Sequence, residues 1–108
     1  MANTFKNYTS KSVGTSAATI YTCPSATQTT IIGLTVGNTT SSPITCDVYM
    51  TSGGTDYYLV KGATVPVGGS LVPIGGDQKL CLEAADVLKV VSSAASSADV
   101  IASLLEIA

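Results

Sequence analysis

The chain has 108 residues and a formal net charge of −2, with 5 lysines, 7 acidic residues and neither arginine nor histidine. This composition forms no basic surface for a phosphate backbone and lacks the commonest general base, which disfavours nucleic-acid binding and most acid–base catalysis. Only 11% of the residues are charged, against about 25% in average globular domains. Such a surface either stays soluble through neutral Ser, Thr and Gly or is largely covered by other subunits, and we favour the second interpretation.

The first 14 residues are polar, with Phe5 and Tyr8 as their large apolar side chains. We expect residues 1–14 to be an N-terminal arm that reaches a neighbour, or an edge strand, ahead of one β-domain over residues 15–108. The start lacks the charged and apolar regions of a signal peptide, and no run reaches the roughly 18–20 apolar residues that span a bilayer. We therefore expect synthesis in the cytoplasm and no membrane partner.

The segment TTIIGLTVGNTT, residues 29–40, is the clearest predicted strand. Ile32, Leu34 and Val36 alternate with Gly and Thr in it, and β-branched residues dominate. Before it, SAATIYTC is expected to form a strand that ends at Pro24, because proline cannot donate a ladder hydrogen bond.

Two alternating runs around a glycine-rich turn predict a hairpin. ITCDVYM should direct Cys46, Val48 and Met50 toward the core, TSGGTD (51–56) should turn the chain, and YYLVKGATV (57–65) should return.

A second pair of short runs follows. SLVPI (70–74) reads as a strand, GGD (75–77) as a turn and QKLCLE (78–83) as another strand. Its two leucines should face the core, and Cys81 should point outward.

The last segment, LEAADVLKVVSSAASSADVIASLLEI, has two interpretations. Its apolar residues recur at helical spacing, yet it also divides into two apolar runs around SSAASSAD. Periodicity alone does not decide whether 84–106 is a helix or a β-hairpin. We favour strand, turn and strand, with Leu88 and Val90 on one face, because serine side chains compete for backbone hydrogen bonds inside a helix.

Strand and turn patterns thus recur about every 10 residues, a spacing typical of all-β sandwiches and barrels. We predict a single antiparallel β-sandwich of about eight strands, jelly-roll-like in topology.

No group of residues predicts catalysis, a metal site or a cofactor. A Ser–Lys pair of Ser70 with Lys61 or Lys79 is conceivable, but ordinary surface residues on neighbouring strands are favoured. Glu83 and Asp86 could hold a calcium ion at one turn, although a plain acidic turn is favoured. We expect a non-enzymatic protein.

The three cysteines, at positions 23, 46 and 81, form no CxxC pair, and we interpret them as reduced packing residues. As candidates for interface contacts we select side chains that are aromatic or point outward. Tyr57 and Tyr58 are adjacent on one strand, so one should be core and the other interface. The candidates are Phe5, Tyr8, Tyr57, Tyr58 and Cys81.

The sequence resembles small virion structural proteins of tailed bacteriophages, especially marine and cyanobacterial phages. The most specific segments of the resemblance are the strand that ends in NTT, LVKGATVPVGG and GGDQKLCLEAADVLKVVSSAASSADV. The resemblance runs from about Phe5 to Ile107. In relatives the position of Ala85 is often glycine, and this departure weakens the expectation of a left-handed residue at that turn. The resemblance carries no catalytic residues.

The resemblance implies a β-sandwich that builds into the virion. We expect a capsid decoration (cement) protein that forms a homo-oligomer, most plausibly a trimer, and bridges subunits of the major capsid protein. The alternatives are a tail, neck or fibre-attachment component, or a receptor- or carbohydrate-binding module on the virion. The last alternative needs aromatic residues on loops, whereas those of this chain lie in predicted strands.

Overall fold

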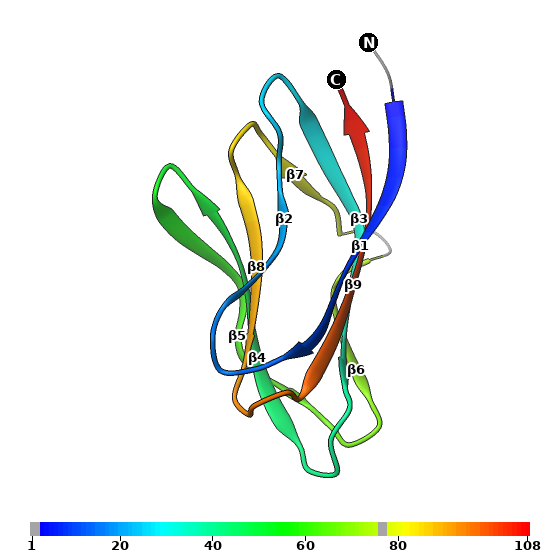
Figure 1. Cartoon of the computed structure of the whole chain (residues 1–108), viewed down its shortest axis with the longest axis vertical. Coiled ribbons are helices and arrows are strands. Elements are labelled where there is room, and N and C mark those ends of the chain that lie inside the picture. Colours follow the sequence, from blue (N-terminus) through cyan, green and yellow to red (C-terminus); the bar gives the residue numbers. More distant parts are fainter. Residues whose placement is uncertain (1–2, 76–77) are drawn as a thin grey trace.

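The computed structural model describes residues 3–75 and 78–108, so the end of the turn predicted at 75–77 lies outside the described residues. The described chain is all β and contains no helix (Figure 1). This confirms the predicted fold class. The nine strands are β1 (Asn3–Val13), β2 (Ala18–Thr22), β3 (Gln28–Asn38), β4 (Ile44–Ser52), β5 (Thr55–Val65), β6 (Ser70–Ile74), β7 (Leu80–Leu82), β8 (Val87–Ser92) and β9 (Ala98–Ile107).

The strands form two antiparallel sheets in the order β1-β9-β3-β6, with β7 also paired to β3, and β2-β8-β4-β5. The chain therefore pairs its first strand with its last, its second with its second-last, and so on inward to the β4–β5 hairpin. A long hairpin rolled up in this way is a jelly roll. Both β6 and β7 pair with β3, at opposite ends, so nine strands occupy the eight positions expected.

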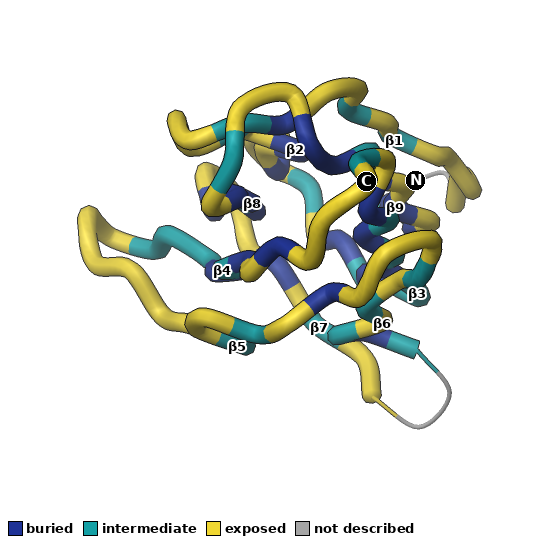
Figure 2. Tube along the Cα trace, turned by 90° about the horizontal axis from the view of Figure 1, so that it is seen from below, coloured by how far each residue is buried: buried dark blue, intermediate teal, exposed yellow. Residues whose placement is uncertain are grey.

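The core lies between the two sheets, where buried residues gather while the outer faces remain exposed (Figure 2). Leu88 and Val90 are fully buried, as the alternation in VLKVV predicts. The accessible surface is 5590 Å², and a folded monomer of 10.9 kDa should expose about 5,600 Å². The chain thus closes its own core without a partner.

A bulge in β3 changes which side chains of this strand face inward. Its pairing with β9 shifts between Ile31 and Gly33, so Ile31 is fully buried while Ile32 is only half-buried. Beyond the bulge Leu34 and Val36 face the core. The prediction that Ile32 shares the side of Leu34 and Val36 is therefore wrong, because the bulge adds one residue to the strand and shifts the alternation.

The segment 82–107 contains two strands, as predicted, but they do not form a hairpin with each other. β8 belongs to the four-stranded sheet and β9 to the five-stranded sheet, so the serine-rich bridge crosses between sheets. Ser97 is fully buried; its hydroxyl donates to the carbonyl of Ala94 at 2.7 Å and contacts the hydroxyl of Ser92. The serines thus satisfy polar groups inside the crossover.

The predicted hairpin of TSGGTD is confirmed. β4 and β5 pair along their length, and Gly53 and Gly54 both have positive φ, as a tight two-residue hairpin turn requires. The tip of this hairpin projects from the body of the sandwich (Figure 1). Consequently Tyr57 is 55% and Tyr58 is 44% exposed, and the expectation that one of them belongs to the core is wrong.

Candidate functional site

The outer face of the five-stranded sheet carries few charged side chains. Its rows follow the strand register: Phe5 lies beside Leu105, Leu105 beside Thr30, and Thr30 beside Cys81. The intervening residues of β9 are buried, so these side chains point outward. We define the neutral face as the uncharged outward side chains in the central part of this surface, namely Phe5, Asn7, Thr9, Thr30, Ile32, Gly33, Thr35, Cys81, Ile101, Ser103 and Leu105. Asp99 also points outward, near the start of β9, where it contacts Lys11.

The neutral face combines projecting apolar side chains with shallow hollows. Phe5 is 75% exposed and Ile101 is 53% exposed, which are high values for large apolar residues. Next to Phe5 lies a hollow of about 280 Å³ that Asn7, Ile32 and Ser103 also line. A second hollow of about 270 Å³ lies beside Ile101. Contiguous apolar surface of this kind is a feature of interaction sites, whereas single exposed apolar side chains are common on any protein.

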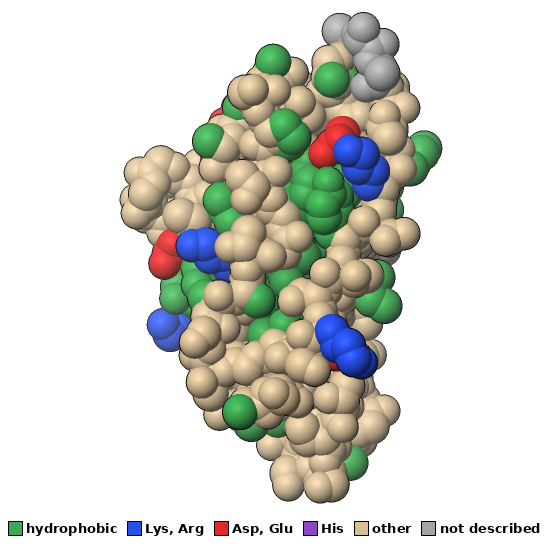
Figure 3. Space-filling view, viewed as in Figure 1, with side chains coloured by type: hydrophobic (Ala, Val, Ile, Leu, Met, Phe, Trp, Pro, Cys, Tyr) green, Lys and Arg blue, Asp and Glu red, His purple; other side chains and the backbone are tan. Residues whose placement is uncertain are grey.

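Charged side chains near the neutral face are paired within the chain. Lys11 contacts Asp99 at 3.6 Å at one end of the face, and Lys6 contacts the buried Glu106 at 2.9 Å on the inner side of β1. In Figure 3 the charged side chains form isolated patches on a mostly uncharged surface. A partner on the neutral face would therefore meet few unpaired charges.

The outer face of the four-stranded sheet has a different character. Tyr58 stacks against Tyr49 with ring centroids 4.8 Å apart, and the Nζ of Lys61 lies 4.4 Å from the centroid of the Tyr58 ring. Lys89 lies beside Tyr49 on the neighbouring strand, and the backbone N–H of the bulged Gly62 donates to Asp47. This face carries charges of both signs.

The structure separates the five predicted interface residues into three groups. Phe5 and Cys81 share one row of the neutral face, although 76 positions of sequence separate them. Tyr57 and Tyr58 lie on the projecting hairpin. Tyr8 is half-buried, and its ring packs edge-on against Tyr21 with centroids 4.8 Å apart, so it belongs to the internal packing.

A buried polar cluster joins the two sheets below β1. The hydroxyl of Tyr21 donates to Glu106 at 2.5 Å and lies 2.8 Å from the hydroxyl of Thr29. The hydrogen bonds from Tyr21 and Lys6 lower the pKa of Glu106, whereas burial and the neighbouring carboxylate raise the pKa of Tyr21. The composition did not predict this cluster, which holds β1 and β2 against β9.

Several of the chemical groups considered from the sequence have structural contacts. The carboxylate of Asp86 accepts the backbone N–H of Glu83 at 2.9 Å and so closes the turn. Among residues 3–75 and 78–108, no cluster of three or more His, Cys, Asp or Glu could hold a metal ion. Lys61 lies over the ring of Tyr58, and Ser70 pairs with Gly37 on β3.

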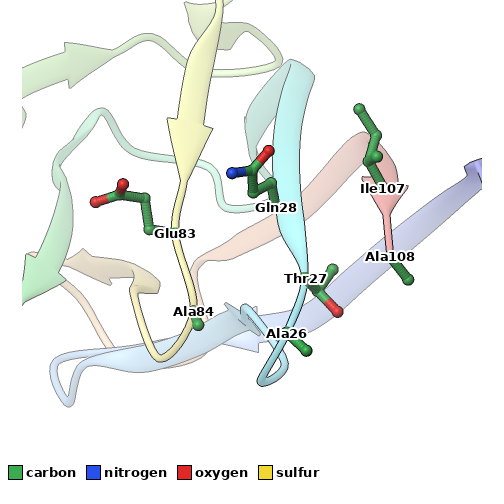
Figure 4. A pocket seen from close by; sticks show the side chains of 7 residues that line it. All are labelled: Ala26, Thr27, Gln28, Glu83, Ala84, Ile107 and Ala108. Atoms are coloured by element: carbon green, nitrogen blue, oxygen red, sulfur yellow. The ribbon is translucent and has the colours of Figure 1, made fainter. Parts of the chain in front are cut away.

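Another hollow, of about 480 Å³, lies where the β2–β3 and β7–β8 turns meet the C-terminal end. Its side chains do not converge on one point (Figure 4). They are mostly small and come from three separate segments: Ala26, Thr27, Gln28, Glu83, Ala84, Ile107 and Ala108.

The cysteines follow the predicted register. Cys23 and Cys46 are buried and Cys81 is exposed. Burial raises the pKa of the Cys46 thiol. The sulfur of Cys23 lies 3.4 Å from the hydroxyl of Thr29, at the border of the polar cluster.

No family model and no curated protein matches the chain. Among solved structures, a protein of the Bacillus endospore appendages, described as a novel family of disulfide-linked pili, has a TM-score of 0.57 and 17% sequence identity. The alignment covers 97% of this chain and 85% of that one. At this identity the likeness shows a shared fold alone. In the described part of the chain no helix is long and apolar enough to cross a membrane.

Proposed function

We propose that this chain is a non-enzymatic structural protein of a bacteriophage virion, a capsid decoration protein that self-associates and bridges capsid subunits. The observation that carries the proposal is the neutral face, which exposes Phe5 and Ile101 without an unpaired charge among its outward side chains. A surface of this composition loses little hydration energy when a partner covers it.

The mechanism of such a protein is mechanical. Each copy would join neighbouring shell subunits through moderate contacts, and many copies together would hold the shell against internal pressure through multivalency. The compact, self-contained sandwich suits this role because it remains folded before it reaches the particle. The resemblance of the sequence to virion proteins supports the location, with the major capsid protein as the expected partner.

Three other functions share parts of this support. A tail, neck or fibre-attachment component would use the same fold in a ring or spike. A receptor- or carbohydrate-binding module is favoured less, because the exposed Tyr58 is already stacked against Tyr49 and Lys61.

A disulfide-linked filament, as described for the Bacillus appendages, is the third alternative. Of the three cysteines, only Cys81 is exposed, and one exposed thiol per chain joins chains in pairs rather than into a polymer. We therefore favour the shell over the disulfide-linked filament.

The test is binding of the purified chain to expanded capsids assembled without it. We expect saturable co-sedimentation with the capsids and greater resistance of the decorated shells to heat or osmotic shock. Unexpanded shells serve as the control for nonspecific adsorption. Absence of binding to the shell, together with binding to tails or to host cells, would replace the decoration role by one of the alternatives.

A further inference from the structure

We infer that the neutral face binds the same face of a second copy of this chain, through a twofold axis that lies in the interface and runs across the strands. The inference deepens the proposed function and rests on it only for the place where the dimer acts. It makes a dimer, and not the trimer expected from the sequence, the basic unit.

The charge distribution favours a second copy as the occupant. Asp99, at one end of the face, is already paired with Lys11 of the same chain, and Lys6 contacts the buried Glu106 on the inner side of β1. Two neutral faces therefore meet without like-charge repulsion. The opposite outer face carries Asp47, Lys61 and Lys89, and a copy docked there would have to dehydrate charges.

The dimensions of the face are sufficient for a stable dimer. β9 has 10 residues, which at about 3.3 Å each span about 33 Å. The sheet has four strand positions, the last shared by β6 and β7, and at about 4.8 Å each they cover about 19 Å. Each copy thus offers about 630 Å², so a dimer would bury about 1,300 Å² in total. This area lies within the roughly 1,200–2,000 Å² of specific protein interfaces.

The shape of the neutral face allows two copies to fit together around a twofold axis. Ile101 projects from the middle of β9, and the hollow that Phe5, Ile32 and Ser103 line lies further along the same strand pair. A twofold axis between these two features places Ile101 of one copy over the hollow of the other, and the same operation produces the reciprocal contact. The row of Asn7, Ser103 and Gly33 near the axis has small or short side chains, so the two sheets can approach closely.

The test uses charge substitutions at exposed positions, which leave the fold intact because each chain closes its own core. The wild-type chain is expected to sediment as a dimer, and Ile101→Lys or Phe5→Lys should raise the dissociation constant by at least about tenfold, since each introduces a charge that the interface would bury without a partner. Val67→Lys is the matched control: Val67 is 52% exposed but lies in the β5–β6 connection, outside the neutral face, so its variant should remain a dimer.

A mixing experiment makes the test specific for self-association. Ile101→Lys and Ser103→Glu variants should each be monomeric, because each introduces an unpaired charge into the interface. An equimolar mixture should form heterodimers that native mass spectrometry resolves, since the introduced ammonium group then lies over the introduced carboxylate in the partner's hollow. Failure of the mixture to associate more strongly than either variant alone would overturn the twofold contact at Ile101. A monomeric wild type, or a trimer that Ile101→Lys leaves unchanged, would also overturn it.

The two proposals fail in different experiments. A dimer that Ile101→Lys dissociates, but that does not bind capsids, supports the inference and rejects the decoration role. A wild-type monomer whose capsid binding is lost in Ile101→Lys rejects the inference, because the shell protein would then occupy the neutral face.

Discussion

The backbone of the turn at residues 83–86 is strained at Ala85, and replacement of this residue by glycine should remove the strain. Ala85 has a φ of 74°, in the left-handed region that glycine adopts readily and alanine does not. The turn is nevertheless fixed, because the N–H of Ala85 donates to Cys23 at 2.9 Å and the N–H of Cys23 donates to Asp86 at 2.9 Å. Because alanine stands where relatives often have glycine, the sequence did not favour a left-handed residue at this position. The structure nevertheless has one.

The magnitude of the effect follows from two opposing contributions. A left-handed conformation costs an L-residue about 1–2 kcal/mol. Replacement of alanine by glycine adds freedom to the unfolded chain, which costs about 0.4–1 kcal/mol. Because the Ala85 methyl group is exposed, its removal loses no buried contact. The mid-range values of the two contributions predict that Ala85→Gly stabilises the fold by about 0.8 kcal/mol and raises Tm by about 3–6 °C.

The measurement is thermal and urea unfolding of Ala85→Gly beside Ala84→Gly. Ala84 is also exposed but does not have a positive φ, so its glycine variant should lose about 0.4–1 kcal/mol. Opposite signs at two adjacent positions would support the reasoning. If Ala85→Gly destabilises the protein as much as Ala84→Gly does, the left-handed residue is not a source of strain and the argument is refuted.

Three further predictions concern the cysteines, the polar cluster and the crossover. A thiol reagent should label Cys81 in the folded subunit much faster than Cys46, and equal protection of both would contradict the β7 register. The lowered pKa of Glu106 stabilises the fold at pH values above the pKa of this carboxyl in the unfolded chain, and that stability is lost as the pH falls through the lower folded pKa. Glu106→Gln should remove this part of the acid dependence in unfolding titrations; an unchanged pH profile would show that other groups cause it. Ser97→Ala should cost about 1–2 kcal/mol in urea unfolding, because the partly buried carbonyl of Ala94 loses the hydroxyl that donates to it. A loss below the error of the measurement would contradict that role.

Local patterns in the sequence were sufficient for most of the strands. The alternation around Val48 and around Leu88 has the period of two that a strand on a core requires, and both residues are fully buried. The TSGGTD turn was predictable because two glycines supply the positive φ of a tight hairpin. The bulge at Ile32 was not, since it depends on pairing with β9, which follows some 70 residues later.

The arrangement of the last two strands and of the neutral face depends on long-range strand pairing, which local sequence patterns do not specify. The run around SSAASSAD contains no information about whether its two strands join one sheet or two, and the structure places them in different sheets. The alternation of ADVIASLLE places Ile101 and Val100 on opposite sides of the strand, but it does not indicate which side faces solvent. The neutral face is assembled from β1, β9, β3 and β7, so it could not be predicted without knowing the register in which these strands pair.

The position and copy number of this chain in intact particles test the central claim most directly. A reconstruction of the virion, combined with quantitative mass spectrometry, should show many copies distributed over the capsid shell, each as a β-sandwich in contact with the major capsid protein. A few copies confined to the neck, tail or fibres, or absence from the particle, would contradict the decoration role.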